Sequence, residues 1–130
     1  MDETKRLYEE VKKGSISAAF RLAEAFKWGY YGQISPRRAA RMYRICCHSK
    51  NKKTAALGYY NLGLLYYHGY LSEDERSDPA RAFTCFMKSA LTYATGDALL
   101  KLGDMYRYGQ YVEKSEDTAM NLYVRANQKA

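Results

Sequence analysis

The residue types that most often perform catalysis or bind metals are few in this chain. Cys46, Cys47 and His48 are consecutive, and consecutive helical residues point about 100° apart, so these side chains do not converge on one ion. We interpret the two cysteines as small residues that fill space in a helix. The chain has no glycine-rich phosphate loop and no paired carboxylates in an apolar site. We therefore expect no catalytic residue, cofactor or metal; an enzyme would need an activity that depends on His68 or Cys47.

Basic residues are the second group whose chemistry indicates a function. The formal net charge is +7, and no Asp or Glu occurs between Ala25 and Ser72. The positive electrostatic field of such a segment attracts acidic partners and speeds their association, but it contributes less to selecting among them. Nucleic acid would give strongly salt-dependent binding, but no nucleic-acid-binding signature is present. A basic stripe on a helix is more often a solvated face, and the alternative is a binding site for an acidic protein or peptide, or for nucleic acid. The predicted basic ridge, which His48 would extend along one helix, comprises Arg37, Arg41, Arg44, Lys50, Lys52 and Lys53.

Acidic residues cluster at positions 73–75, in a segment that we interpret as a solvated loop. This loop carries an insertion relative to the other repeats described below, and a compensating extension lies at 50–53. Variation of this kind is expected in loops, which tolerate insertions better than packed faces do. The acidic loop could pair with the basic ridge of another molecule.

A repeat of 40 residues supplies the elements that must position these groups. A repeat of this length indicates a stacked array, in which neighbouring units bury each other's apolar faces. Each copy follows the pattern small-x-x-x-Leu-small-x-x-aromatic-x-x-Gly, whose steps of four, four and three residues place these side chains on one helical stripe. The aligned positions are Leu22, Leu62 and Leu102; Phe26, Tyr66 and Tyr106; Gly29, Gly69 and Gly109.

Each repeat is predicted to contain two helices. The small residue beside the leucine would let a neighbouring backbone come close, and the closing glycine suits the left-handed conformation that ends helices. A second helix is expected after each cap, followed by an alanine and an aromatic residue on its buried stripe. The caps are Ser35-Pro36, Asp78-Pro79 and Ser115-Glu116, and the buried residues are Ala39, Ala82, Ala119, Tyr43, Phe86 and Tyr123.

The chain is predicted to be one domain, residues 1–130. Residues 1–14, with Leu7 and Val11 four apart, would form a capping helix; the repeats would span 15–53, 54–94 and 95–130. The last helix would run to Ala130 with nothing over its outer side, so the protein is a monomer or associates weakly through this end. The first 14 residues resemble no secretory signal, and no apolar run could span a membrane. Three cysteines, two of them adjacent, fit reduced thiols, so we expect a cytoplasmic protein.

The A-x-x-x-L-G-x-x-Y-x-x-G core over about residues 15–130 resembles the Sel-1-like repeat, a relative of the tetratricopeptide repeat. The copies depart from it at Ala23, where Gly is usual, and at Gly69-Tyr70-Leu71-Ser72; only the third retains the usual valine, Val112. The resemblance implies an all-α right-handed superhelix, an α-solenoid of three antiparallel helix pairs with non-catalytic adaptor function. Secreted members with disulfides fit poorly, because no first helix contains cysteine.

The resemblance also implies which residues face the groove formed by the first helices, the concave face that would bind a peptide or helix. Aromatic rings on such a face supply much of the contact energy. The alternative is that the same rings fill the packing between repeats. The implied residues are Phe20, Arg21, Glu24, Lys27 and Trp28; Tyr60, Asn61, Leu64, Tyr67 and His68; Leu100, Lys101, Asp104, Arg107 and Tyr108.

Overall fold

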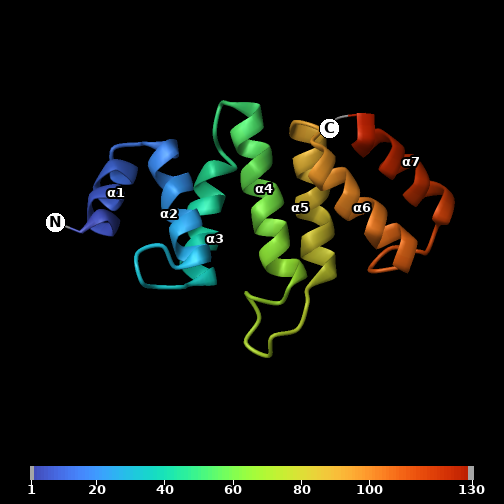
Figure 1. The fold of residues 1–130 in the computed structure, drawn as a ribbon, viewed down its shortest axis with the longest axis horizontal. Helices are drawn as coiled ribbons and strands as arrows, with labels where there is room; N and C mark the ends of the chain where they lie inside the picture. The colour runs from blue at the N-terminus through green and yellow to red at the C-terminus, as the bar shows by residue number, and fades with distance from the viewer. Residues whose placement is uncertain (1, 129–130) are drawn as a thin grey trace.

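The computed structural model describes residues 2–128, which form seven helices and no strand. Each helix packs against the next one along the chain, so the helices form an elongated row from the N-terminus to the C-terminus (Figure 1). This arrangement confirms the predicted all-α repeat fold. The helices are α1 (Glu3–Lys12), α2 (Ile16–Trp28), α3 (Pro36–Cys46), α4 (Lys52–Tyr67), α5 (Pro79–Thr92), α6 (Gly96–Tyr108) and α7 (Glu116–Gln128).

The helix starts follow the predicted capping chemistry. A helix leaves its first backbone N–H groups without an internal partner, and a side-chain oxygen just before the helix can accept from one of them. All three second helices begin in this way. The side-chain oxygens of Ser35, Asp78 and Ser115 accept from the N–H groups of Arg38, Arg81 and Thr118 at 3.2, 3.1 and 3.1 Å.

The closing glycines all adopt left-handed backbone conformations, as predicted. Gly29 and Gly109 cap α2 and α6 with φ of 74° and 65°. Gly69 has φ of 76° and follows His68, which caps α4. Non-glycine residues pay a steric penalty in this region, so these turns depend on glycine.

The small residue beside the leucine has a different role from the predicted one. A Cβ at Gly63 would lie 2.7 Å from the Phe86 ring, and one at Gly103 would lie 2.7 Å from the Tyr123 ring. The glycine therefore makes room for an aromatic side chain of the second helix in the same hairpin, and not for a neighbouring backbone. Close backbone approach occurs instead at Gly58, where a Cβ would lie 2.9 Å from the Tyr43 carbonyl oxygen.

Two details of the predicted basic ridge are wrong. His48 lies beyond the end of α3, so it does not extend the helical row of arginines. Lys52 and Lys53 form the first turn of α4 and are not in a loop, because the Asn51 side chain accepts a hydrogen bond from the N–H of Thr54 at 3.1 Å and starts the helix early.

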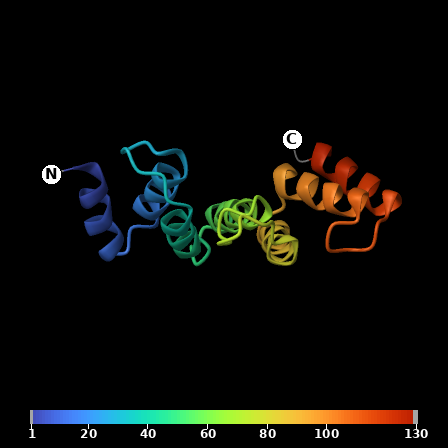
Figure 2. The same cartoon turned by 90° about the horizontal axis from the view of Figure 1, so that it is seen from below.

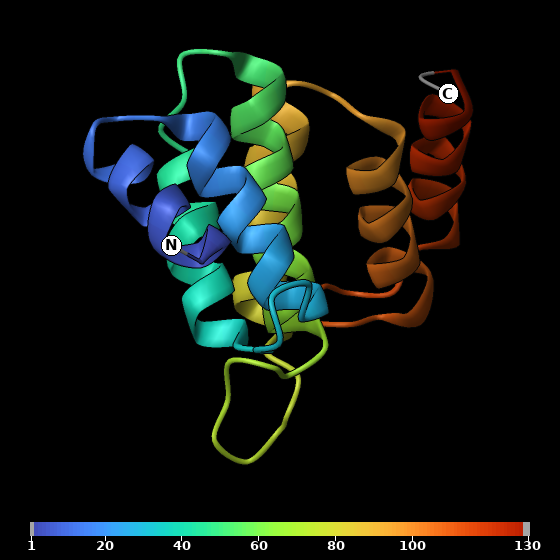
Figure 3. The ribbon, with the colours of Figure 1, turned by 60° about the vertical axis from the view of Figure 1, so that its left-hand side comes forward.

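The last hairpin is turned relative to the one before it. Figure 2 shows α4 and α5 nearly end-on, whereas α6 and α7 lie along the plane of the picture. Figure 3 shows α6 and α7 to one side of the other helices and the loop between α4 and α5 projecting away from them. On α7, Met120 and Val124 are exposed, as are the polar Arg125 and Asn127.

The predicted end of the last helix at Ala130 lies outside the described residues, and the repeat boundaries at 15–53, 54–94 and 95–130 stay a prediction. Among the helices of residues 2–128, none is both long and apolar enough to cross a membrane.

Candidate functional site

The residues predicted to face the groove differ in how far their side chains are exposed to solvent. Six project into solvent, with Trp28 57% and Tyr108 63% exposed. Asn61 is only 8% exposed, which makes it part of the packing between helices. The exposed residues are Arg21, Trp28, His68, Leu100, Arg107 and Tyr108; the half-buried ones are Phe20, Glu24, Lys27, Tyr60, Leu64, Tyr67, Lys101 and Asp104.

An apolar hollow of about 520 Å³ lies between α2 and α4, and we call it the Trp28 hollow. It brings together four of the predicted residues: Lys27, Trp28, Leu64 and His68. The sequence pattern missed the other walls because two of them lie in turns, one begins α3, and one lies on α4 outside the predicted groove positions. These walls are Ile34, Pro36 and Tyr70, together with Leu65 of α4.

Polar contacts hold the Trp28 indole in place. Its Nε1 donates to Glu24 Oε2 at 3.2 Å, and Lys27 Nζ lies 5.1 Å from its ring centroid. Lys27 Nζ also donates to Asn61 Oδ1 at 3.1 Å, which links α2 to α4. An ammonium over an indole face is attracted by the ring quadrupole. The indole therefore presents an ordered apolar surface to solvent.

His68 lies at the same hollow, and aromatic rings pack against its imidazole. Burial, followed by the positive charges of Lys101 and Lys27, lowers the pKa of its imidazole. The ring packs edge-on against Tyr67 at 5.4 Å and tilted against Tyr70 at 5.8 Å. His68 thus contributes a neutral ring to the surface near physiological pH.

Tyr60 and Tyr67 are mainly packing residues. Their ring centroids lie 5.8 and 6.3 Å from that of Phe86, which is fully buried. Tyr67 also donates through its hydroxyl to Gln110 Oε1 at 2.8 Å, and Lys101 Nζ lies 5.4 Å from its ring centroid. The contacts of Tyr67 with Gln110 and Lys101 join the second and third hairpins, whereas the contact of Tyr60 with Phe86 lies within the second hairpin. Both tyrosines therefore take part in packing between helices.

Glu24 and Asp104 occupy equivalent positions in the first and third repeats, and each accepts a hydrogen bond within its own hairpin. The Tyr43 hydroxyl donates to Glu24, and the Tyr123 hydroxyl donates to Asp104 at 2.6 Å. The second repeat has the apolar pair Leu64 and Phe86 at the same places. A carboxylate that already accepts from a tyrosine hydroxyl has less capacity for a partner.

The remaining predicted residues of α2 and α6 also have intramolecular contacts. Phe20 packs edge-on against Tyr43 at 6.3 Å, and Arg21 lies 3.6 Å from the Glu3 carboxylate. The Arg107 guanidinium lies 5.4 Å from the ring centroid of Tyr108. Arg107 and Tyr108 are both exposed and lie at the end of α6.

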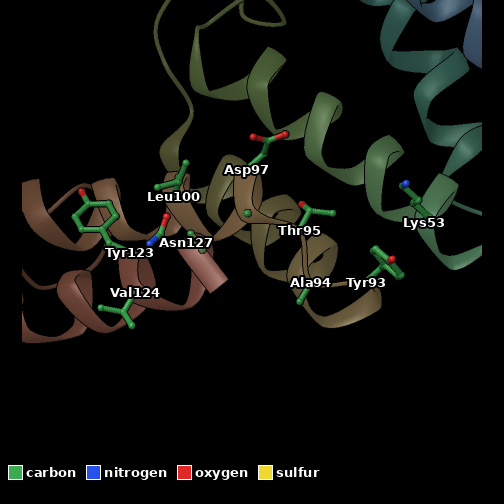
Figure 4. A pocket seen from close by; sticks show the side chains of 11 residues that line it. Lys53, Tyr93, Ala94, Thr95, Asp97, Leu100, Tyr123, Val124 and Asn127 are labelled. Carbon is green, nitrogen blue, oxygen red and sulfur yellow. The ribbon is translucent and has the colours of Figure 1, made fainter. Parts of the chain in front are cut away.

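A wider hollow of about 1030 Å³ lies where α6 and the end of α7 meet the linker after α5 (Figure 4). Leu100 is its one predicted groove residue, and Lys53 of the predicted ridge lies on its far side. Tyr93 and Val124 add apolar surface. This hollow is broad, so it offers a contact area and no enclosed site.

A third hollow, of about 410 Å³, gathers guanidinium groups, and we call it the arginine hollow. Arg37, Arg41 and Arg44 of α3 lie along one side of it, as the ridge predicts. Arg81 of α5 joins them, a residue that the sequence pattern did not assign to the ridge. Its other walls are Ala40, Tyr66 and Leu71. Lys50 is exposed in the connection after α3, outside this hollow.

The surroundings of the three cysteines disfavour the thiolate form. Burial raises the pKa of the Cys46, Cys47 and Cys85 thiols to about 11, 12 and 11. Thiols in such surroundings are poor nucleophiles, since the thiolate is the reactive form. Within residues 2–128, no three His, Cys, Asp or Glu side chains are grouped as metal ligands.

A row of stacked helical hairpins with exposed hollows between them defines an α-solenoid. The Sel1 repeat model matches residues 16–45, 56–91 and 96–129, and the chain belongs to the Sel1 repeat family. Proteins of this family generally act as non-catalytic adaptors in protein interactions.

Among solved structures, the chain is similar to a Sel1 repeat protein from Oxalobacter formigenes, with 19% sequence identity and a TM-score of 0.49. That similarity covers 98% of this chain and 64% of the other, so the chain spans less than two thirds of that protein. Comparison with curated proteins gives no significant match.

Proposed function

We propose that this protein is a non-catalytic adaptor that binds a peptide or a helix of a partner protein on the concave face formed by α2, α4 and α6. The observation that carries the proposal is the Trp28 hollow. It is apolar, it is open to solvent, and it is lined by an indole that intramolecular contacts hold in place. Binding sites of this kind take one bulky apolar side chain as an anchor.

In this proposal, Trp28 and the exposed residues of α6 contact different parts of the bound segment. The Trp28 hollow takes the anchor side chain, and Arg107 and Tyr108 contact the continuation of the bound segment. Asn61 acts indirectly, because its amide oxygen fixes Lys27 next to the indole. The three unpaired thiols fit a reducing compartment, which supports a cytoplasmic site of action.

The test is selection of a random peptide library on the purified protein, followed by affinity measurement of the enriched peptides. We expect enriched peptides to share a bulky apolar residue, and Trp28→Ala to weaken their binding at least about tenfold. Leu91→Ala is the matched control, because Leu91 is 79% exposed on α5 and lines none of the three hollows. Enrichment without an apolar residue, or equal affinity of wild type and Trp28→Ala, would contradict the proposal.

Tyr60 and Tyr67 are poor choices for this test. Alanine at either position would remove a ring that packs on the fully buried Phe86. Loss of binding could then arise from a damaged core. Trp28 and Tyr108 are exposed, so their replacement leaves the packing between hairpins in place.

A further inference from the structure

The arginine hollow is a separate site from the Trp28 hollow, and the two share no lining residue. Four guanidinium groups from two helices surround it. Arg37 and Arg81 are each 71% exposed, so their charged ends reach solvent. Between Ala25 and Ser72 the chain has no acidic residue, so the α3 side of the hollow has no carboxylate of its own.

The charges in the arginine hollow are only partly compensated. Arg81 Nη1 lies 2.8 Å from Asp78 Oδ2, and Arg37 Nη2 lies 3.8 Å from Glu73 Oε1. Within residues 2–128, Arg41 and Arg44 have no carboxylate within ion-pairing distance. Arg44 Nη2 instead donates to the Tyr66 hydroxyl at 3.0 Å, which directs its guanidinium toward the hollow. Two positive charges therefore remain for a ligand.

The acidic loop of residues 73–75 lies at one end of the arginine hollow. Glu73 is in contact distance of Arg37, yet its side chain is 93% exposed. An exposed ion pair at this distance is weak and easily exchanged. The loop thus places the Glu73 carboxylate at Arg37, where a carboxylate of a partner protein would also bind.

The spacing of the arginines suits an extended chain. Arg37 and Arg41 are one turn apart on α3, about 6 Å along the axis, and Arg44 lies about 10.5 Å from Arg37. Alternate side chains of an extended peptide are about 6.7 Å apart. A short peptide with carboxylates at alternate positions can therefore reach two arginines of α3 and Arg81 across the hollow.

We propose that the arginine hollow binds a short segment of a partner protein that is rich in Asp or Glu, and that the chain's own loop 73–75 competes for it. A nucleic acid is a poorer fit, since its regularly spaced phosphates would run onto the acidic loop and onto Asp78, which lines the adjoining hollow together with Arg81. Guanidinium groups bind carboxylates with paired, directional hydrogen bonds.

The test uses a fluorescein-labelled decapeptide of alternating Glu and Ser and measures fluorescence anisotropy with the whole protein. We expect saturable binding that weakens with added salt, and no binding of the same peptide with Gln in place of Glu. The double variant Arg41→Ala/Arg44→Ala should weaken binding at least about tenfold. The matched control Lys50→Ala/Lys52→Ala removes two exposed positive charges outside the hollow and should change affinity less than about twofold.

A separate variant tests whether the loop competes with the peptide for the arginine hollow. Glu73→Gln/Glu75→Gln should raise affinity about twofold to fivefold, because the internal carboxylates no longer compete. Asp74 is left in place, since its carboxylate accepts from the Ser72 hydroxyl and from the Arg76 N–H and organises the turn. Glu9→Gln/Glu113→Gln makes the same change in net charge at exposed positions elsewhere and should leave affinity unchanged.

Three results would overturn the proposal. Equal loss of binding in the arginine and lysine double variants would mean attraction by net charge alone. Unchanged binding in Arg41→Ala/Arg44→Ala would remove the hollow from consideration. Tighter binding of a labelled single-stranded oligonucleotide than of the acidic peptide would replace the protein partner with nucleic acid. Trp28→Ala should leave acidic-peptide binding unchanged, so this proposal and the proposed concave-face function fail independently.

Discussion

Replacement of Gly63 by alanine tests the packing rule that sets the distance between the two helices of a hairpin. Alanine is a better helix former than glycine by about 1 kcal/mol, so helix propensity alone predicts that Gly63→Ala is stabilising. The structure predicts the opposite. The new Cβ would lie 2.7 and 2.9 Å from two Phe86 ring carbons and 3.1 Å from the Cys85 Cβ, where ordinary contact begins at 3.4 Å.

The Phe86 ring has little freedom to yield. It is fully buried and lies between the rings of Tyr60 and Tyr67, at centroid distances of 5.8 and 6.3 Å. Inserting a methyl group into such a core costs about 1–3 kcal/mol. After the gain in helix propensity is subtracted, we expect Gly63→Ala to lower the free energy of unfolding by about 1 kcal/mol.

The assay is urea unfolding followed by far-UV circular dichroism, with the midpoint and slope compared between variants. Relief of the clash provides the control: in Gly63→Ala/Phe86→Leu the combined cost should be less than the sum of the single costs by at least about 0.5 kcal/mol. A rise in stability of about 1 kcal/mol on Gly63→Ala would refute the reasoning, because helix propensity alone produces that result.

Two further predictions concern the turns and the thiols. Gly69→Ala should destabilise the protein by about 1–2 kcal/mol more than Gly109→Ala in the same unfolding assay. Both variants lose a glycine with left-handed backbone, but only the new Cβ at position 69 would lie 2.5 Å from a backbone oxygen, that of Glu75. Equal losses of stability in the two variants would count against this explanation. The three cysteines should react with a thiol reagent at pH 8 on the order of 100-fold more slowly in the native protein than in the urea-unfolded protein, since burial raises their pKa to about 11, 12 and 11. The absorbance of the released reagent measures this difference, and rapid reaction of one native thiol would show that its surroundings are not as described.

Local signals in the sequence were sufficient for the helices and most of their ends, although the start of α4 at Lys52 was missed. The capping residues Ser35 and Asp78 and the closing Gly29 act on backbone groups a few positions away, so their effect does not depend on the rest of the fold. The 40-residue period likewise predicts a stack of hairpins, because an amphipathic unit of this size needs a neighbour to cover its apolar face. For the same reason the expected capping helix at 1–14 appears as α1.

The candidate sites were only partly predictable. The family resemblance placed Trp28 and Leu64 on one face, but it could not show that Ile34 and Tyr70, which lie in turns, complete the same hollow. It also assigned Asn61 to the groove, where packing between α2 and α4 encloses the side chain.

The sequence by itself determined which segments are helical, where most of them begin and end, and which stripe of each is apolar, because these properties depend on neighbours within one or two turns. The tertiary structure alone decided which polar and aromatic side chains stay open to a partner. Arg81 joins Arg41 and Arg44 around one hollow although 37 residues separate Arg44 from Arg81. Such groupings depend on how each hairpin is rotated against the next, and that rotation is set by packing of whole helices, which a periodic pattern does not specify.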